Sequence, residues 1–497
     1  MTLLKSVTSA QPDHQPITYE RVYVFGNMEE NMSKIASDTK TASDLLADHF
    51  TNVSFRDLPP KLILDAKTLV ADYLGVAIAG SQTDSGAIAA RFANETGGKA
   101  EATLIGHAGR VPAVHAAFAN AISSHSIELD DVDVLALFHF SPPIVSAALA
   151  IAEREKSSGE DFIAAVALGC EMMARASAAA NNSLRDRGYH TTPTCGVFGA
   201  TIAAARLLKL DRDQIVSALG LAGAQSSGLM EMYGPSMQKR FNPGPAARNG
   251  ITAALMAKLG FTGAATIFDG ERGFLRAFTD KFNLGELTKG LGKDYPIYME
   301  YKAYSCARPI HNAIDCALNI RKQMKEPIAN VSAITMQRHP AWANYHLNTR
   351  PKTYHEAQVS LPYSTAVALL EGNALLPQYQ DEKLDDPEIL RLSQMIKVVP
   401  NSSLPRGVSC LMTLRTTGGA EFNSQIDHPR GSIENPMSSE DMSNKAHMLG
   451  DDIIGRPAMD ALIERAGNVE KLASLGEIMG LVVPKAPVRA AIGGRHA

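Results

Sequence analysis

Apolar residues recur at helical spacing along most of the first 300 residues. The segments with this spacing are rich in alanine, and Gly, Pro and Asp separate them, as is typical of helices joined by short loops. Helices are predicted at residues 62–79, 111–126, 143–157, 161–178, 195–208, 212–225 and 245–259. Because small side chains allow helix axes to approach closely, the pattern predicts a tightly packed helical bundle.

The pattern changes after about residue 305, where short segments of alternating polarity appear. Strands are predicted at residues 331–337, 396–399, 410–416 and 420–426. Gly418 and Gly419 separate the last two segments, which predicts a β-hairpin. Helices are predicted in the same region at residues 310–325 and 364–372, so this region is α+β.

The end of the chain returns to a helical pattern. Ser438, Glu440 and Asp441 together predict a helix start with a capping hydroxyl and an acidic first turn. The predicted fold class is mainly α, with a large all-helical domain built from both chain ends and a smaller α+β domain between them. The predicted parts are a poorly ordered tail (1–41), the first helical part (42–303), the α+β domain (304–434) and the C-terminal helical part (435–497).

Composition and charge exclude several classes of partner. The 497 residues are 45% apolar and carry a formal net charge of -4, so no overall attraction to nucleic acid or an anionic membrane is expected. No uninterrupted apolar stretch reaches the roughly 20 residues that span a bilayer. We therefore expect neither a nucleic-acid partner nor a membrane-embedded protein.

The cysteines indicate a reducing compartment. They are five in number, widely spaced and without a C-x-x-C pair, namely Cys170, Cys195, Cys306, Cys316 and Cys410. This pattern argues against a disulfide framework and against a metal site made of thiolates. The N-terminal residues lack the apolar core of a signal peptide and the Arg-rich character of a transit peptide. The predicted location is the cytoplasm, with mitochondria as the alternative.

Four residues that bear a cation or an imidazole stand in short distinctive phrases. They are His139 in LFHFSPPIVSAALA, His190 in RGYHTTPTCGVFGA, Lys239 in QKRFNPGPAARNG and His311 in YKAYSCARPIHNAIDCA. A polycarboxylate needs several cations to hold it, and acid–base chemistry needs groups that titrate near neutrality. Taken singly, most of these residues are more often structural. Together they predict a site for a small polyanion.

Lys239 and Arg240 stand just before Gly244, where a glycine turn and the start of a helix are predicted. Free N–H groups and the macrodipole at a helix start attract carboxylates. A pair of solvated loop charges is the alternative interpretation. His190 lies in a hydroxyl-rich turn before a helix predicted to begin near Gly196, where neighbouring hydroxyls can orient the imidazole.

An acidic group precedes His139 in the chain. It consists of Glu128, Asp130, Asp131 and Asp133. These residues lack the EF-hand pattern and an accompanying H-x-x-x-H, so no metal site is predicted. A carboxylate beside His139 would instead raise the pKa of its imidazole and help it to act as an acid. His311, with Lys302, Tyr304 and Arg308, stands where the helical part gives way to the α+β domain, and such boundaries often bind small molecules.

The phrases, in their order and spacing, resemble the MmgE/PrpD family, which includes 2-methylcitrate dehydratases, cis-aconitate decarboxylases and an iminodisuccinate epimerase. The resemblance covers residues 42–490. Its marks are Glu128-Leu129-Asp130-Asp131, His139-x-Ser141, Gly188-Tyr189-His190 with Gly196 and Gly199, Lys239-Arg240 with Gly244-x-Ala246-Ala247, Tyr301-Lys302 through His311, and Asn435-Pro436-Met437. The family implies that the α+β domain is a lid, that the protein is a homodimer, and that the chemistry needs no metal or organic cofactor.

The resemblance also implies a set of site residues. The implied residues are His139, His190, Lys239 and His311, which we predict to be catalytic, and one of the acids Glu128, Asp130 or Asp131. The predicted substrate-binding residues are these three acids with Tyr189, Arg240, Lys302 and Tyr304. The family aligns one of the three acids with the pocket, and it carries histidine in many members where this chain has Asn242. The expected partner is a small polycarboxylate.

The hypothesis that follows is a lyase that decarboxylates cis-aconitate to itaconate. Lys239, helped by Arg240 or Lys302, holds the carboxylates, and His190 or His311 donates a proton to the allylic carbanion. Dehydration of 2-methylcitrate or a related alkylcitrate is the first alternative. Epimerisation of an iminodisuccinate, with Tyr189 and Lys239 as opposed bases, is the second, and a non-enzymatic helical interaction protein is the third.

Overall fold

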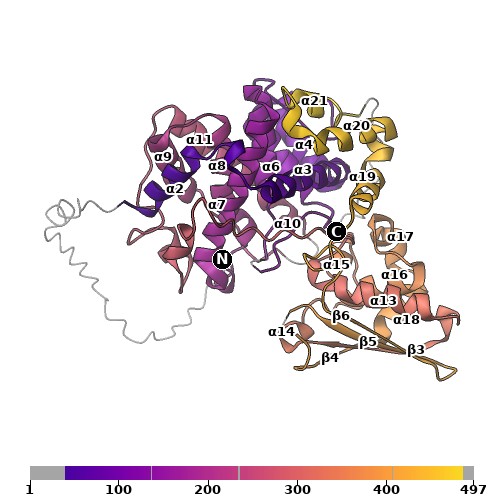
Figure 1. Cartoon of the computed structure of the whole chain (residues 1–497). Helices are drawn as coiled ribbons and strands as arrows, with labels where there is room; N and C mark the ends of the chain where they lie inside the picture. The colour runs from indigo at the N-terminus through magenta and orange to yellow at the C-terminus, as the bar shows by residue number, and fades with distance from the viewer. Residues whose placement is uncertain (1–39, 136, 233–235, 406, 485–497) are drawn as a thin grey trace, which may run out of the picture. The chain divides into compact units, whose positions relative to one another are not determined.

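The protein is mainly α with a small α+β part, as predicted, in a computed structural model that describes residues 40–135, 137–232, 236–405 and 407–484 (Figure 1). Most of the predicted tail, residues 1–39, lies outside the described residues, as do residues 485–497 at the C-terminal end. The described residues from Thr41 onward belong to one compact unit.

The first helical part begins with a series of helices. They are α2 (Ala42–Asn52), α3 (Pro60–Gly80), α4 (Asp84–Thr96), α5 (Ala113–Ser124), α6 (Ser141–Glu155), α7 (Gly159–Asp186), α8 (Thr191–Leu207), α9 (Arg212–Gly223), α10 (Gln238–Phe241) and α11 (Pro243–Lys258). The seven helices predicted in this region are all present. α4 was not predicted because its buried face is made of Ser85, Gly86 and alanines, which give a weak hydrophobic signal.

Two local predictions in this part were wrong, and both concern Pro or Gly in the first turn of a helix. α8 begins at Thr191 and not near Gly196. Pro193 is tolerated there because backbone N–H groups in the first turn of a helix have no intrahelical partner, so proline loses no hydrogen bond by lacking one. Gly244 does not form a turn. α10 runs into α11 through Asn242, and Gly244 packs closely against Ile122, where a Cβ would stand 2.9 Å from that side chain.

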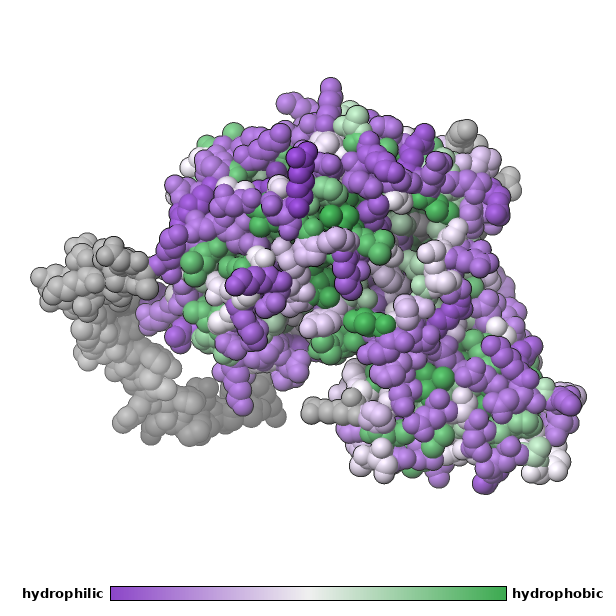
Figure 2. Space-filling model, in the orientation of Figure 1, coloured by the Kyte–Doolittle hydropathy of each residue, from purple (hydrophilic) through white to green (hydrophobic). Residues whose placement is uncertain are grey.

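α7 lies at the centre of the bundle. Among the described residues it is the one helix that is long and apolar enough to cross a membrane. However, 94% of its most apolar 18-residue segment is buried inside the protein. Such burial is typical of a core helix. On the face shown in Figure 2, hydrophilic residues cover much of the surface and apolar residues form separate patches.

The α+β part is built on a four-stranded sheet with the order β4-β3-β5-β6. The strands are β3 (Val331–Arg338), β4 (Ile396–Pro400), β5 (Cys410–Thr416) and β6 (Glu421–Ile426). β5 and β6 form the predicted antiparallel hairpin, whereas β3 and β4 are parallel. A parallel pair needs a long crossover, and the chain between β3 and β4 contains α15 (Tyr354–Gln358), α16 (Leu361–Glu371) and α18 (Pro387–Met395). α13 (His311–Gln323) packs on β5 and β6.

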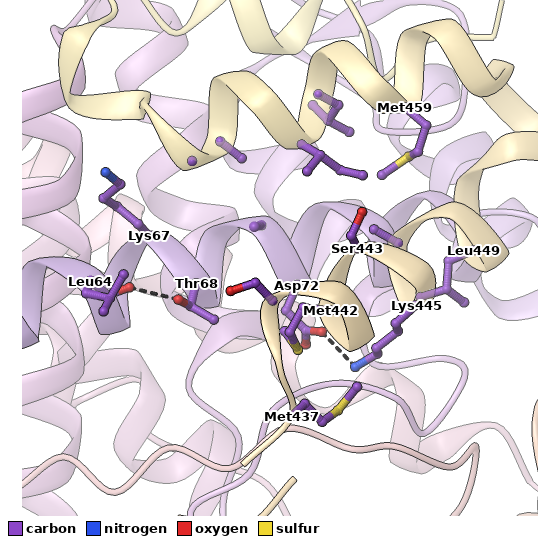
Figure 3. A pocket seen from close by; sticks show the side chains of 17 residues that line it. Leu64, Lys67, Thr68, Asp72, Met437, Met442, Ser443, Lys445, Leu449 and Met459 are labelled. Carbon is purple, nitrogen blue, oxygen red and sulfur yellow. Dashed lines mark hydrogen bonds and ion pairs between the residues drawn. The ribbon is translucent and has the colours of Figure 1, made fainter.

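The C-terminal helices return to the bundle, as the predicted fold class requires. α19 (Ser439–Ile454) and α20 (Arg456–Gly467) pack on α3, and Ser438 caps α19 through a capping box. A pocket of about 350 Å³ lies among these three helices (Figure 3). At this pocket the Lys445 ammonium donates to Asp72 Oδ1 and to the Leu129 carbonyl oxygen, both at 2.7 Å. The last helices thereby fix a loop that carries predicted site residues.

Candidate functional site

The loop between α5 and α6 carries the acidic residues into the core. Glu128 adopts a left-handed backbone conformation with φ 55°, which a non-glycine residue keeps only when its surroundings hold it there. The neighbouring carbonyl groups are held on both sides: Ile127 accepts from the Ser305 hydroxyl at 2.7 Å, and Leu129 accepts from Lys445. The loop is therefore placed by segments that are far away in the chain.

The Glu128 carboxylate joins three cations. Oε1 accepts from Lys239 and Arg240 of α10, and Oε2 accepts from Lys302 at 2.9 Å. Lys302 also lies 3.3 Å from Asp130 Oδ1. The side chains of Glu128, Arg240 and Lys302 are at most 2% exposed, whereas Lys239 is 12% exposed. Lys239 is thus the cation of this group that best reaches a ligand.

Burial and charge act in opposite directions on these groups. Burial would raise the pKa of Glu128, but Lys239, Lys302 and Arg240 hold it well below its usual range. Burial would lower the pKa of Lys302, but Asp130 and Glu128 raise it. For Lys239, burial outweighs the attraction of Glu128 and lowers the pKa to about 8. The group is therefore ionised at neutral pH.

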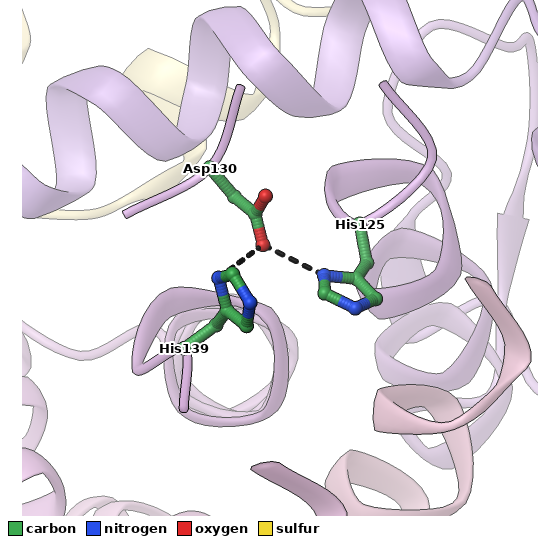
Figure 4. A group of neighbouring side chains, drawn as sticks. All are labelled: His125, Asp130 and His139. Carbon is green, nitrogen blue, oxygen red and sulfur yellow. Dashed lines mark hydrogen bonds and ion pairs between the residues drawn. The ribbon is translucent and has the colours of Figure 1, made fainter. Parts of the chain in front are cut away.

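Asp130 anchors two imidazoles with one oxygen. His125 Nδ1 lies 2.7 Å and His139 Nδ1 lies 3.0 Å from Asp130 Oδ2 (Figure 4). The charges of His139, Lys302 and His125 hold the pKa of the Asp130 carboxyl well below its usual range despite its burial, so the carboxylate can only accept. Both Nδ1 atoms are accordingly assigned as N–H donors, which leaves each Nε2 without a proton in the neutral form.

His125, Asp130 and His139 are also the kind of group that can hold a metal ion, since their donor atoms lie within 4.8 Å of one another. A metal ion held by the two Nδ1 atoms would displace the protons that both imidazoles share with Asp130. The Lys302 ammonium beside Asp130 would also repel a divalent cation. The contacts therefore fit a hydrogen-bonded group better than a metal site.

Asp131 holds the start of α6. Its Oδ2 accepts from the Phe140 N–H at 2.7 Å and its Oδ1 accepts from the Ser141 N–H at 3.0 Å. The His139 N–H donates to Thr192 Oγ1 at 3.1 Å, and the His139 imidazole also bonds the Asp131 carbonyl oxygen. Both carboxylate oxygens of Asp131 are thus used to position His139, and the predicted contact of Asp131 with a substrate stays a prediction.

His190 is held in one orientation by Asn242. The Asn242 amide Nδ2 lies 3.0 Å from His190 Nδ1 and donates to it, so a neutral His190 carries its proton on Nε2. Burial, with the charges of His125 and His139, lowers the pKa of His190 well below its usual range. His190 is therefore a neutral imidazole that can donate a hydrogen bond from Nε2.

The structure brings most of the predicted site residues together but leaves three apart from the Glu128 and Asp130 contacts. His311 accepts from Arg308 at 3.1 Å through Nδ1, and its Nε2 lies 3.3 Å from the Cys306 carbonyl oxygen. Tyr304 donates to Asp315. The Tyr189 ring packs against Phe278. The roles predicted for these three residues remain predictions.

Comparison with known proteins decides the family. The sequence model of the MmgE/PrpD N-terminal domain matches residues 44–287, and that of the MmgE/PrpD C-terminal domain matches residues 304–468. The chain belongs to the MmgE/PrpD family. It is 26% identical over 467 residues to the cis-aconitate decarboxylase-like protein oryM of Aspergillus oryzae, covering 88% of this chain and 96% of that protein. It is 25% identical to the cis-aconitate decarboxylases of Aspergillus terreus (91% of this chain, 98% of that one) and Homo sapiens (90% and 96%).

Two residues that contact the predicted site residues were not named from the sequence. His125 lies five residues before Asp130, and its signal was its place directly before the acidic group. Gln358 of α15 had no signal, because its partners are far away in the chain. Its Oε1 accepts from Arg240 at 2.9 Å, and its Nε2 donates to the Ile127 carbonyl oxygen at 3.0 Å. Gln358 thus joins the MmgE/PrpD C-terminal domain to the loop that carries Glu128.

Because His125 is buried, we expect the free energy of unfolding to decrease in acid. Burial lowers the pKa of His125 to about 4, against 6.5 for an ordinary histidine. Between these values the unfolded chain binds more protons, so the free energy of unfolding falls as the pH decreases through this range. For His125 alone we expect a loss of about 1–2 kcal/mol between pH 7 and pH 5, measured by urea unfolding. His125→Asn should reduce this loss, whereas replacing the exposed His428 by Asn should not.

Proposed function

We propose that this protein decarboxylates an aconitate-type tricarboxylate, with cis-aconitate to itaconate as the principal reaction. The enzyme is a lyase of the MmgE/PrpD family. The observation that carries the proposal is the convergence of Lys239, Arg240 and Lys302 on Glu128, beside two imidazoles anchored on Asp130. The names of the relatives support the same substrate class.

Lys239 is the main group for holding the substrate. Its ammonium has three donors, of which Glu128 takes one, and its side chain is the most exposed of the three cations. Lys302 and Arg240 are almost fully buried against Glu128, and they contribute their positive charge from there. In a buried setting these charges stabilise the electron pair that remains when a carboxylate leaves as CO2. We propose that the reaction needs no metal or organic cofactor, because these cations supply the stabilisation.

His139 is the acid in this proposal. Its Nδ1–H faces Asp130 and the Asp131 carbonyl oxygen, which fix the orientation of the ring, and its side chain is 10% exposed. The bond between the leaving carboxylate and the carbon skeleton breaks, CO2 departs, and the electron pair left on the allylic carbon takes the proton from His139 Nε2. Solvent returns a proton to His139 before the next turnover.

His190 and His311 fit the role of acid less well. A neutral His190 keeps its Nε2 proton, and protonation at Nδ1 would cost the hydrogen bond from Asn242. Its Nε2–H suits a donor to a substrate oxygen. Both ring nitrogens of His311 are within hydrogen-bonding distance of protein groups, Arg308 and Cys306.

The experiment that tests the function offers the purified protein four acids separately. They are cis-aconitate, trans-aconitate, 2-methylcitrate and iminodisuccinate, and the measurements are CO2 release, ultraviolet absorbance of the double bond and optical rotation. CO2 from cis-aconitate, with itaconate as the product, is expected. Loss of water from 2-methylcitrate without release of CO2 would instead show that the protein is a dehydratase. Racemisation of iminodisuccinate would show that it is an epimerase. If no acid reacts, the substrate class is wrong.

A further inference from the structure

His125 has a nitrogen that no protein group satisfies. Within the described ranges, the Nε2 atom of His125 is buried without a hydrogen-bond partner, and the residue is 0% exposed. Its Nδ1 donates to Asp130, so Nε2 carries a bare lone pair. A buried polar atom left unpaired destabilises the folded state. Beside predicted catalytic groups, such an atom indicates a site for a ligand.

The groups around His125 come from several elements. Asp130 holds Nδ1, and the rings of His139 and His190 lie 4.8 and 6.3 Å away, centroid to centroid. Arg240 donates to the His125 carbonyl oxygen at 3.3 Å, and Lys239 acts on the imidazole through its charge. The Nε2 atom therefore lies among the residues to which the proposed reaction is assigned.

The charges of the site are close to balance before any ligand binds. The buried cations Lys239, Arg240 and Lys302 are matched by three carboxyl groups, Glu128, Asp130 and Asp131. A tricarboxylate would add negative charge to a group that is already nearly balanced, at a high cost in a buried setting. A proton taken up together with the ligand would reduce this cost, and the bare Nε2 of His125 is a place that can hold it.

We propose that His125 is a further substrate-binding residue, which takes up a proton at Nε2 when a polycarboxylate binds and donates it to one of the ligand's carboxylates. The imidazolium then stands between two carboxylates, that of Asp130 and that of the ligand, and both nitrogens are satisfied. Burial lowers the pKa of His125 to about 4 in the absence of a ligand, so the free protein does not carry this proton at neutral pH. The inference rests on the proposed function, since it requires a polycarboxylate in the site.

His125 fits this role better than its neighbours do. Asn242 already donates to His190 Nδ1, so a second proton on His190 would break that contact. His139 is partly exposed, and water can satisfy its Nε2 without a ligand. The enclosed Nε2 of His125 has neither alternative among the described residues.

The test measures proton uptake with propane-1,2,3-tricarboxylate, a saturated analogue that has no double bond to stabilise a carbanion. Titration calorimetry at pH 7 in phosphate and in Tris, buffers with different ionisation enthalpies, reports how many protons the complex takes up. The wild-type protein is expected to take up protons. His125→Asn, which keeps an N–H near Nδ1 but removes Nε2, should take up about one proton fewer and bind roughly 10- to 100-fold more weakly.

Two further variants separate the role of His125 from a structural one. His125→Gln offers a fixed N–H near Nε2, so it should bind more tightly than His125→Asn while still taking up about one proton fewer than the wild type. His107→Asn is the matched control. His107 is also a histidine with a pKa lowered by burial, but it bonds the Ser81 carbonyl oxygen and contacts none of the site residues named above. Its replacement should leave proton uptake unchanged.

The outcomes distinguish this inference from the proposed function. If the wild type does not bind the analogue, the polycarboxylate class fails and the role of His125 fails with it. If the wild type binds the analogue and the His125 variants take up as many protons as the wild type, the role of His125 is wrong while the proposed function stands. For variants that do not fold, the spectrum of ¹⁵N-histidine in the wild type decides, because one bare imidazole nitrogen must become an N–H when the analogue binds.

Discussion

Glu128→Gln is expected to lower the free energy of unfolding by about 3–5 kcal/mol, because the change removes the negative charge that Lys239, Arg240 and Lys302 share. The amide has the size of the carboxylate, so packing is kept while three buried cations are left to repel one another. Burial and these cations would also lower the pKa of Lys239 below its present value of about 8, so its ammonium would be lost near neutral pH. Turnover should fall to background. Urea unfolding and initial rates with cis-aconitate measure the two effects.

The control for Glu128 is an ion pair on the surface. Lys61 and Asp65 lie 2.6 Å apart, but the Lys61 side chain is 82% exposed. Asp65→Asn should change the free energy of unfolding by less than about 1 kcal/mol, since solvent screens such a pair. A similar small change for Glu128→Gln would contradict the role of Glu128 as the centre of the cationic group.

His139→Gln is expected to reduce turnover of cis-aconitate by about 10²- to 10⁴-fold, the range that a general acid contributes. The glutamine cannot deliver a proton, but it leaves Lys239 and the other cations in place. Binding of propane-1,2,3-tricarboxylate should therefore weaken by less than about 10-fold, as measured by titration calorimetry. The expected result is a loss in the rate of the chemical step with little loss of affinity.

His339 offers a control for His139. Its Nδ1 accepts from the Ala341 N–H in the α+β part, at an exposed position. His339→Gln should keep the wild-type rate. If His139→Gln keeps most of its rate while His190→Gln loses it, the proton comes from His190, which was predicted from the sequence as a donor together with His311. The assignment of His139 as the acid is then wrong.

Local patterns predicted most helices and strands of this protein. The predicted helices agree with α3 and α5–α9 to within a few residues, apart from the longer C-terminal end of α7 and the early start of α8, and the Gly418-Gly419 hairpin is present. These elements carry strong periodicity or a turn whose chemistry is local. The errors arose where local signals allow two outcomes. Pro193 and Gly244 are residue types that favour loops, so loops were predicted there. In the structure both residues lie inside helices of the packed bundle.

The site was predictable to the extent that its residues stand in distinctive phrases. Glu128, His139, His190 and Lys239 were named in this way. In the structure, Lys239 bonds Glu128, and the rings of His139 and His190 lie near that of His125. Gln358 was not found, because its contacts join residues more than 50 positions apart. His125 stands three residues before Glu128, but this position alone does not distinguish a functional histidine from one that ends a helix. Its unpaired Nε2 exists only in the folded chain.

The sequence by itself determined the helical bundle, the small sheet, the family and the kinds of side chain available for a polycarboxylate. These features depend on periodicity, turn chemistry and short phrases, which are local properties of the chain. Tertiary structure alone decided which acid joins the cations, which imidazoles share Asp130, and which nitrogens face protein groups. Charge balance, proton positions and pKa values depend on distances between groups from separate segments and on their burial. Only folding sets these quantities.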